Sequence, residues 1–121
     1  MRRILILDDD ADIRLILKVF LERDGQTKVH EASDAAAGWA LLQATDLDLV
    51  VLDQQLPDSS GMEVLQRIQR LIPTPPPVVV LTASRDMELR QSLLDQGARA
   101  VLNKPFDPAA LVNELRVFLN D

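Results

Sequence analysis

Five short apolar runs alternate along this chain with longer segments in which apolar residues recur every three or four positions. The runs match strands buried on both faces, and the longer segments have the period of amphipathic helices. Because helices connect consecutive parallel strands, the alternation predicts one α/β domain spanning 1–121, with a parallel sheet covered on both faces. The expected strands are residues 3–8, 27–31, 47–53, 77–83 and 100–103.

The segments between the runs predict five helices. Clear apolar stripes mark three of them: Ile13, Ile16, Leu17, Phe20 and Leu21; Val64, Leu65, Ile68, Leu71 and Ile72; and Leu111, Leu115, Phe118 and Leu119. The second and fourth are expected near 34–44 and 85–96, and the fourth has few anchors, so it should be the least tightly held. Gly25 and Gly97 suit left-handed helix ends, and Ser60 with Glu63 has the spacing of a capping box.

Composition excludes several classes of site. There is no cysteine, so disulfides and thiolate metal sites are excluded, and the single histidine, His30, rules out a multi-histidine metal site. A formal charge of −6 with scattered basic residues argues against direct binding to nucleic acid or to anionic membranes. The first apolar run is too short for a signal peptide or a membrane span, so we expect a cytoplasmic protein.

Polar residues collect where the expected strands end. Asp8 and Asp9 follow the first strand, Asp53 ends the third, Thr82 lies near the end of the fourth, and Lys104 follows the fifth. The carboxyl ends of parallel strands meet at one edge of a sheet, where such sheets bind ligands. Any one aspartate could simply cap a helix, but three converging carboxylates repel one another unless a cation neutralises them. Mg²⁺, or Mn²⁺, suits this site because it accepts carboxylates and leaves positions for phosphate oxygens.

The same residue types suit phosphoryl transfer, in which a protein supplies a nucleophile, alignment and charge stabilisation. Asp53 would be the nucleophile and form an acyl phosphate. Lys104 and Thr82 would each bind one phosphoryl oxygen, and a metal held by Asp8 and Asp9 would bind the third.

The chain resembles the response-regulator receiver family over essentially its whole length. The resemblance rests on four motifs in order: Ile4-Leu5-Ile6-Leu7-Asp8-Asp9-Asp10; Leu49-Val50-Val51-Leu52-Asp53 followed by Pro57 and Gly61; Val79-Val80-Leu81-Thr82-Ala83; and Lys104-Pro105-Phe106. It implies a flavodoxin-like sheet in the order 2-1-3-4-5 with five helices. It also implies a cis peptide between Lys104 and Pro105.

The resemblance implies specific roles and partners. The Gln55 backbone carbonyl joins Asp8, Asp9 and Asp53 as a metal ligand, and Ala83 joins Thr82 and Lys104 in binding the phosphoryl group. The donor is a phosphohistidine of a histidine kinase or a histidine phosphotransfer protein. The domain is then a regulatory phosphoacceptor that catalyses only its own phosphorylation and dephosphorylation. Its switching surface is the fourth helix, fifth strand and fifth helix, which could also form a homodimer.

Two other functions are compatible with the sequence. A degenerate receiver would keep the fold as a phosphorylation-independent interaction module, although the intact site residues argue against it. An enzyme with an aspartyl nucleophile would need a nearby general acid and a cap over its substrate, whereas Gln54 and Gln55 follow Asp53 and no long insertion is present. The output domain or target protein is not encoded in any recognisable segment, so the chain is either a stand-alone regulator or the receiver of a longer protein.

The family's usual switch residue is replaced in this chain. Relatives usually carry an aromatic residue three positions before the conserved lysine, where its rotation accompanies movement of the threonine, but this chain has Val101. We therefore predict that phosphorylation moves the loop after Thr82 and the fourth helix. Amide exchange with and without a phosphoryl mimic should differ within residues 83–97, and identical exchange there would contradict the prediction.

Overall fold

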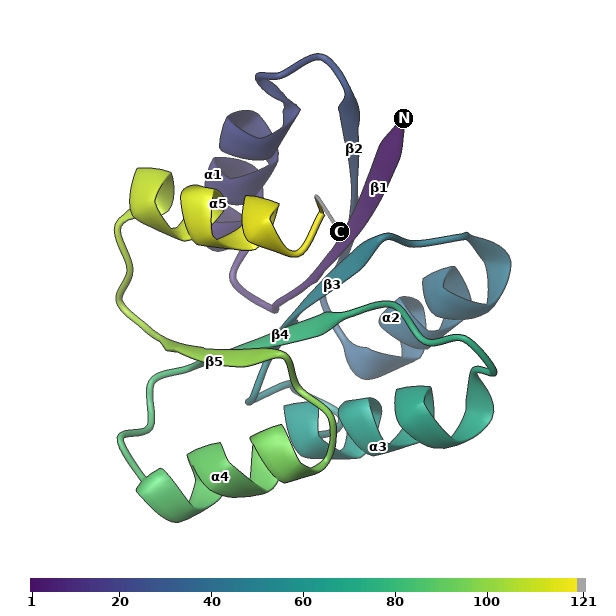
Figure 1. The fold of residues 1–121 in the computed structure, drawn as a ribbon, viewed down its shortest axis with the longest axis vertical. Helices are drawn as coiled ribbons and strands as arrows, with labels where there is room; N and C mark the ends of the chain where they lie inside the picture. The colour runs from purple at the N-terminus through teal and green to yellow at the C-terminus, as the bar shows by residue number, and fades with distance from the viewer. Residues whose placement is uncertain (120–121) are drawn as a thin grey trace.

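The computed structural model describes residues 1–119 and has one sheet of five parallel strands in the order β2-β1-β3-β4-β5 (Figure 1). The predicted fold class and strand order are thus confirmed. The strands are β1 (Arg2–Leu7), β2 (Thr27–Ala32), β3 (Leu49–Asp53), β4 (Val78–Thr82) and β5 (Ala100–Asn103).

A helix follows each strand and covers one face of the sheet. The helices are α1 (Ala11–Glu22), α2 (Ala35–Ala44), α3 (Gly61–Leu71), α4 (Met87–Asp95) and α5 (Pro108–Val117). Figure 1 shows α1 and α5 on one side of the sheet and α2, α3 and α4 on the other. Every strand therefore points the same way, and all five carboxyl ends lie along one edge.

Alternate residues of the strands enter two separate hydrophobic clusters. Ile4 and Ile6 of β1 face the cluster with α1 and α5, whereas Leu5 and Leu7 face the cluster with α2, α3 and α4. All four side chains are fully buried. The strands are apolar throughout because their two faces are both covered.

Local signals place the helix ends close to where the sequence predicts them. A side chain caps each helix N-terminus: Asp10, Asp34, Ser60, Asp86 and Asp107. The Ser60 hydroxyl accepts a hydrogen bond from the Glu63 N–H at 3.2 Å, but the Glu63 carboxylate accepts from the Ser59 hydroxyl at 2.7 Å. Only half of the predicted capping box is therefore present. Gly25 and Gly97 adopt positive φ angles of 69° and 111°, as helix-ending glycines do.

Two predicted core positions lie outside the core. Ile16 of α1 is 39% exposed and Leu71 of α3 is 54% exposed. Ile16 is exposed although its neighbour Leu17 is fully buried, so the contact of α1 with the sheet is narrower than the apolar stripe of the helix. Leu71 is the last residue of α3.

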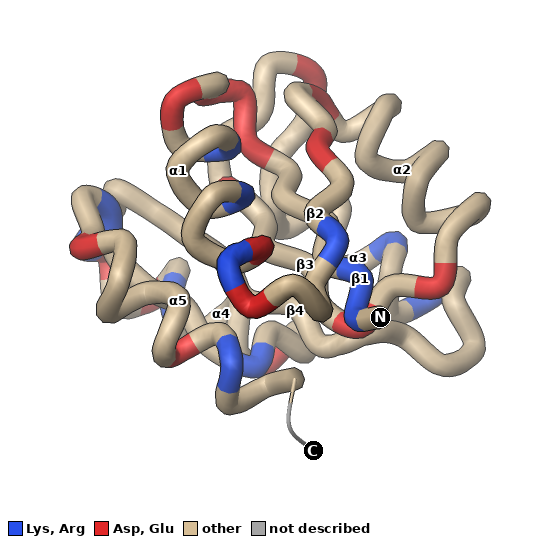
Figure 2. The backbone as a smooth tube through the Cα atoms, turned by 90° about the horizontal axis from the view of Figure 1, so that it is seen from above, with Lys and Arg blue, Asp and Glu red and all other residues tan. Residues whose placement is uncertain are grey.

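Charged residues are spread over the structure. Figure 2 shows lysine and arginine positions on several separate segments of the backbone, interspersed with aspartate and glutamate. Among the described residues, no helix is both long enough and apolar enough to cross a membrane.

Asp24 connects the turn after α1 to α5 through hydrogen bonds and an ion pair. Its carboxylate accepts hydrogen bonds from the Gln26 N–H at 2.8 Å, the Thr27 hydroxyl at 2.9 Å and the Arg116 guanidinium at 2.8 Å. These donors lower the pKa of Asp24 from 3.8 to about 2, with the Gln26 bond as the largest cause, although burial opposes them. The charged form of Asp24 therefore stabilises the folded state.

Replacing Asp24 by Asn should lower the free energy of unfolding near neutral pH by about 1 kcal/mol. Because the folded-state pKa is depressed, the carboxylate's contribution is complete above the ordinary pKa of 3.8 and is lost as pH falls through about 2. Urea unfolding at several pH values should show the wild type and Asp24→Asn converging in acid. Asp46→Asn, which changes an exposed carboxyl before β3, is the control. A difference that is independent of pH would contradict this assignment.

Candidate functional site

Three of the predicted site residues lie at strand ends in the interior. Asp8 follows β1 directly and is only 1% exposed, while its N–H donates to the Ala32 carbonyl at 3.1 Å. Asp53 ends β3 and is 7% exposed, and the buried Thr82 ends β4. Burying these polar groups is unfavourable unless each has a partner.

Lys104 supplies the positive charge between the two buried carboxylates. Its Nζ lies 2.8 Å from Asp8 Oδ2 and 3.2 Å from Asp53 Oδ2. The main-chain N–H of Lys104 donates to the Thr82 carbonyl at 2.8 Å, which joins the segment after β5 to the end of β4. The peptide between Lys104 and Pro105 is cis, as the family resemblance implies.

The pKa values reflect this crowding. Burial, followed by the charge of Asp8, raises the pKa of the Asp53 carboxyl, although Lys104 acts in the opposite direction. Burial alone would lower the pKa of Lys104, but the hydrogen bond and charge of Asp8, together with Asp53, raise it. Lys104 is therefore held in its protonated form, and it offsets only part of the repulsion between the carboxylates.

The acidic residues are grouped closely enough to share a cation. Asp8, Asp9 and Asp53 each offer one carboxylate oxygen, and these oxygens lie within 4.8 Å of one another. Asp9 is exposed, so the group opens to solvent. An all-oxygen donor set with remaining negative charge fits a hard divalent cation such as Mg²⁺, which binds a few carboxylates and keeps several waters.

A cavity of about 660 Å³ opens beside Asp53. Its lining includes four more of the predicted residues: Gln55, Thr82, Ala83 and Lys104. The Thr82 hydroxyl accepts a hydrogen bond from the Ser84 N–H at 3.0 Å, which leaves its own proton available to a ligand. The structure thus brings the predicted phosphoryl-binding residues to one cavity.

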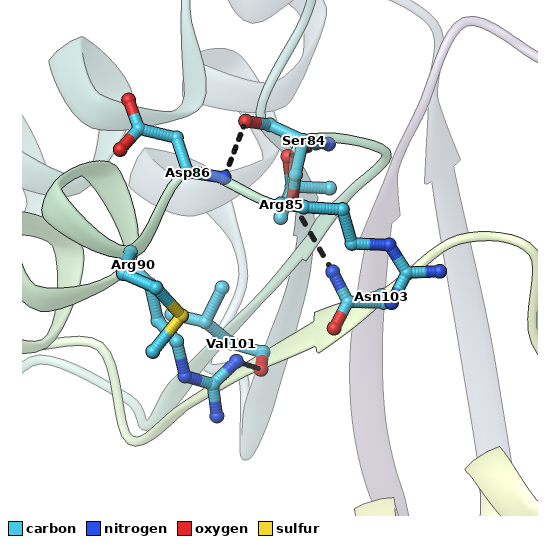
Figure 3. Close-up of a pocket in the computed structure, with 8 residues that line it drawn as sticks. Ser84, Arg85, Asp86, Arg90, Val101 and Asn103 are labelled. Atoms are coloured by element: carbon cyan, nitrogen blue, oxygen red, sulfur yellow. Dashed lines mark hydrogen bonds between the residues drawn. The ribbon is translucent and has the colours of Figure 1, made fainter.

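A second cavity, of about 450 Å³, lies between α4 and β5 next to Val101 (Figure 3). Val101 is buried in the core, and its carbonyl accepts a hydrogen bond from Arg90. The Asn103 amide donates to the Ser84 carbonyl at 3.2 Å, so the loop after β4 is fastened to β5. No aromatic ring occupies this region in the described residues.

Two residues that the sequence reasoning missed support the site from outside. The Arg14 guanidinium donates to the Asp8 carbonyl at 2.7 Å. The Asp58 carboxylate, in the loop after β3, accepts from the Ala35 and Ala36 N–H groups at 2.8 and 3.1 Å and so joins that loop to α2. The hydrogen bond from Ala35 is the largest cause that lowers the pKa of Asp58. Neither residue follows a strand directly, so position gave no signal for it.

Comparison with known proteins agrees with this geometry. The model of the response regulator receiver domain family matches residues 4–116, so the chain belongs to this family and is a receiver domain of a two-component response regulator. Domains of this family are regulatory phosphoacceptors rather than classical enzymes, and they typically bind Mg²⁺.

Individual relatives extend the comparison. A CheY-like receiver domain protein from Methanospirillum hungatei JF-1 has a TM-score of 0.90 and 31% identity, covering 99% of this chain and 94% of its own. The BeF3-activated DrrB receiver domain has a TM-score of 0.88 and 28% identity, covering 100% and 99%. The transcriptional regulatory protein SrrA of Staphylococcus aureus is 32% identical over 116 residues, which are 96% of this chain and 47% of SrrA. The chain thus spans about half the length of the curated relatives it matches.

Gly61 lies against the backbone that carries Asp53. A Cβ atom at this position would come within 2.8 Å of the Asp53 carbonyl oxygen and 2.9 Å of the Gln54 Cα atom. The Gly61 N–H also donates to the Gln54 carbonyl at 2.7 Å. Only a residue without a side chain allows this approach between the start of α3 and the end of β3.

Replacing Gly61 by Ala should lower the free energy of unfolding by about 1–3 kcal/mol, because the added methyl group must displace backbone atoms. Helix propensity alone would change stability in the opposite direction by roughly 0.5–1 kcal/mol. Urea unfolding therefore distinguishes the two effects by sign, and a stabilised Gly61→Ala variant would show that the close approach imposes no constraint.

Proposed function

We propose that this receiver domain accepts a phosphoryl group on Asp53 from a phosphohistidine of a histidine kinase or histidine phosphotransfer protein. The single observation that supports this most strongly is the position of the Lys104 Nζ, which lies 3.2 Å from Asp53 Oδ2 and 2.8 Å from Asp8 Oδ2. Lys104 and Asp53 both line the cavity of about 660 Å³. A fixed cation beside a buried carboxylate can receive an anionic group there.

The reaction would exchange one bond to phosphorus for another. An Asp53 carboxylate oxygen forms the new bond to phosphorus, the bond from phosphorus to the histidine nitrogen breaks, and that nitrogen keeps the electron pair. Lys104 stabilises the charge on the transferred group, and the Thr82 hydroxyl and the Ala83 N–H donate to its oxygens. Water later hydrolyses the acyl phosphate and restores the carboxylate.

Asp8, Asp9, Asp53 and the Gln55 carbonyl would hold the divalent cation. When bound, Mg²⁺ neutralises the carboxylates and supplies positive charge for a phosphoryl oxygen. Asp8 is suited to a fixed ligand because its amide, its carboxylate and its own carbonyl all have protein partners. Asp9, unlike Asp8 and Asp53, is exposed.

We further propose that the domain works in the cytoplasm and transmits its state to an output domain or a separate target protein. The transmitting elements would be the loop after Thr82, α4 and β5, with α5 completing the surface on which a homodimer could form. The contact of Asn103 with the Ser84 carbonyl and that of Arg90 with the Val101 carbonyl join these elements.

Mg²⁺ should raise the thermal stability of the wild type, and beryllofluoride, an acyl phosphate mimic, should raise it further. A ligand that binds only the folded state stabilises it by about 2.7 kcal/mol at a hundredfold excess over its dissociation constant. The beryllofluoride increment should vanish in Asp53→Ala, because the mimic needs the carboxylate oxygen. Thermal unfolding monitored by circular dichroism provides the measurement.

Asp46→Ala is the matched control, since it removes the same charge from an exposed position before β3. It should keep both responses of the wild type. Failure of the wild type to respond to either ligand would contradict phosphorylation at Asp53 and favour the degenerate interaction module instead.

A further inference from the structure

Arg14 is the one arginine whose side chain contacts the backbone between the candidate metal ligands in the described residues. Its Nη1 donates to the Asp8 carbonyl at 2.7 Å, and its Nε donates to Glu31 Oε1 at 3.2 Å. The side chain is only 18% exposed. Arg14 therefore joins the loop after β1 to the end of β2 from within the first turns of α1.

The bonded carbonyl belongs to the peptide that connects Asp8 to Asp9. The orientation of this peptide plane sets how the chain leaves the buried Asp8 and where the exposed Asp9 begins. The next residue is also fixed, because the Asp10 N–H donates to Asp8 Oδ1 at 2.9 Å. Asp9 thus lies between two residues whose main chain is held by hydrogen bonds, although its own side chain is exposed.

We propose that Arg14 is a positioning residue for the divalent cation site, and that it acts by holding the Asp8–Asp9 peptide in the orientation that lets both carboxylates face Asp53. Glu31 orients the guanidinium by the ion pair at 3.2 Å. This inference rests on the proposed metal-dependent phosphorylation. It adds residues of α1 and β2 to a site whose candidate ligands come from the ends of β1 and β3.

The direction in which loss of Arg14 changes Mg²⁺ affinity distinguishes a positioning role from a simple electrostatic one. Arg14 is a cation near a cation site, so removing its charge alone should strengthen Mg²⁺ binding. Removing a residue that orients a metal ligand instead weakens binding, typically about 10–100-fold. The two explanations predict opposite changes in the same quantity.

Lys18 offers a matched control in the same helix. Its Nζ lies 3.9 Å from Glu31 Oε2, so it has the same charge and the same partner as Arg14. Its ion pair does not involve Asp8, whereas Arg14 bonds to the Asp8 carbonyl. Lys18→Met therefore tests the loss of a positive charge near Glu31 without loss of the bond to the loop.

Isothermal titration calorimetry of the full chain with Mg²⁺ should show about tenfold or greater weakening in Arg14→Met. Lys18→Met should bind Mg²⁺ as the wild type does or slightly more tightly. Glu31→Gln should weaken binding less than Arg14→Met, and the double variant should bind no worse than Arg14→Met alone, because both changes act through one contact. Equal or tighter Mg²⁺ binding by Arg14→Met would overturn the proposal.

A second readout needs no metal. Amide exchange of Asp9 and Asp10 in the metal-free protein should be faster in Arg14→Met than in Lys18→Met, because the loop has lost a fixed point. Unchanged exchange would overturn the positioning role. Failure of the wild type to bind Mg²⁺ would contradict the proposed function, and the exchange comparison would still decide whether Arg14 orders the loop.

Discussion

The ammonium group of Lys104 joins three strands of the sheet, because it contacts a carboxylate after β1 and another at the end of β3 while its own backbone follows β5. One positive charge faces Asp8 and Asp53, with Asp9 close by, so the group keeps a negative excess that favours a divalent cation. In the proposed phosphorylation, the same ammonium would let an anionic group approach Asp53. The arrangement depends on strands that all point one way, since only then do these residues share an edge.

The sequence was sufficient to predict the elements that depend on short-range pattern. Apolar runs located the strands to within two residues at each end. Asp53 at the end of β3 and Lys104 directly after β5 were predictable because chain direction fixes the place of residues at strand ends. The role of Arg14 was not predictable, because its bond to Asp8 depends on the spacing between a helix and a loop. The exposure of Ile16 was missed for a similar reason, because a helical stripe does not reveal how wide its contact with the sheet will be. The cis peptide came from the family resemblance alone.

Arg90 joins α4 to β5 through the main chain of Val101. The valine side chain belongs to the same buried cluster as Leu93 of α4 and does not reach the surface. The polar contact between the two elements is made by Arg90 to the Val101 main-chain carbonyl, and so it does not depend on which side chain occupies position 101. A cavity lies beside this contact, and Met87 at the start of α4 is 70% exposed. This agrees with the weak apolar anchoring that the sequence of the helix shows.

The two hydrophobic clusters share no side chain, because the sheet separates them and alternate strand residues belong to one or the other. Substitutions that lie far apart without common partners generally have additive effects on stability. The layer of α1 and α5 can therefore accumulate changes without repacking the layer of α2, α3 and α4, and the reverse also holds. In evolutionary terms, the surface on one side of this domain is free to diverge toward new binding partners while the other side, and the acidic edge between them, retain their chemistry.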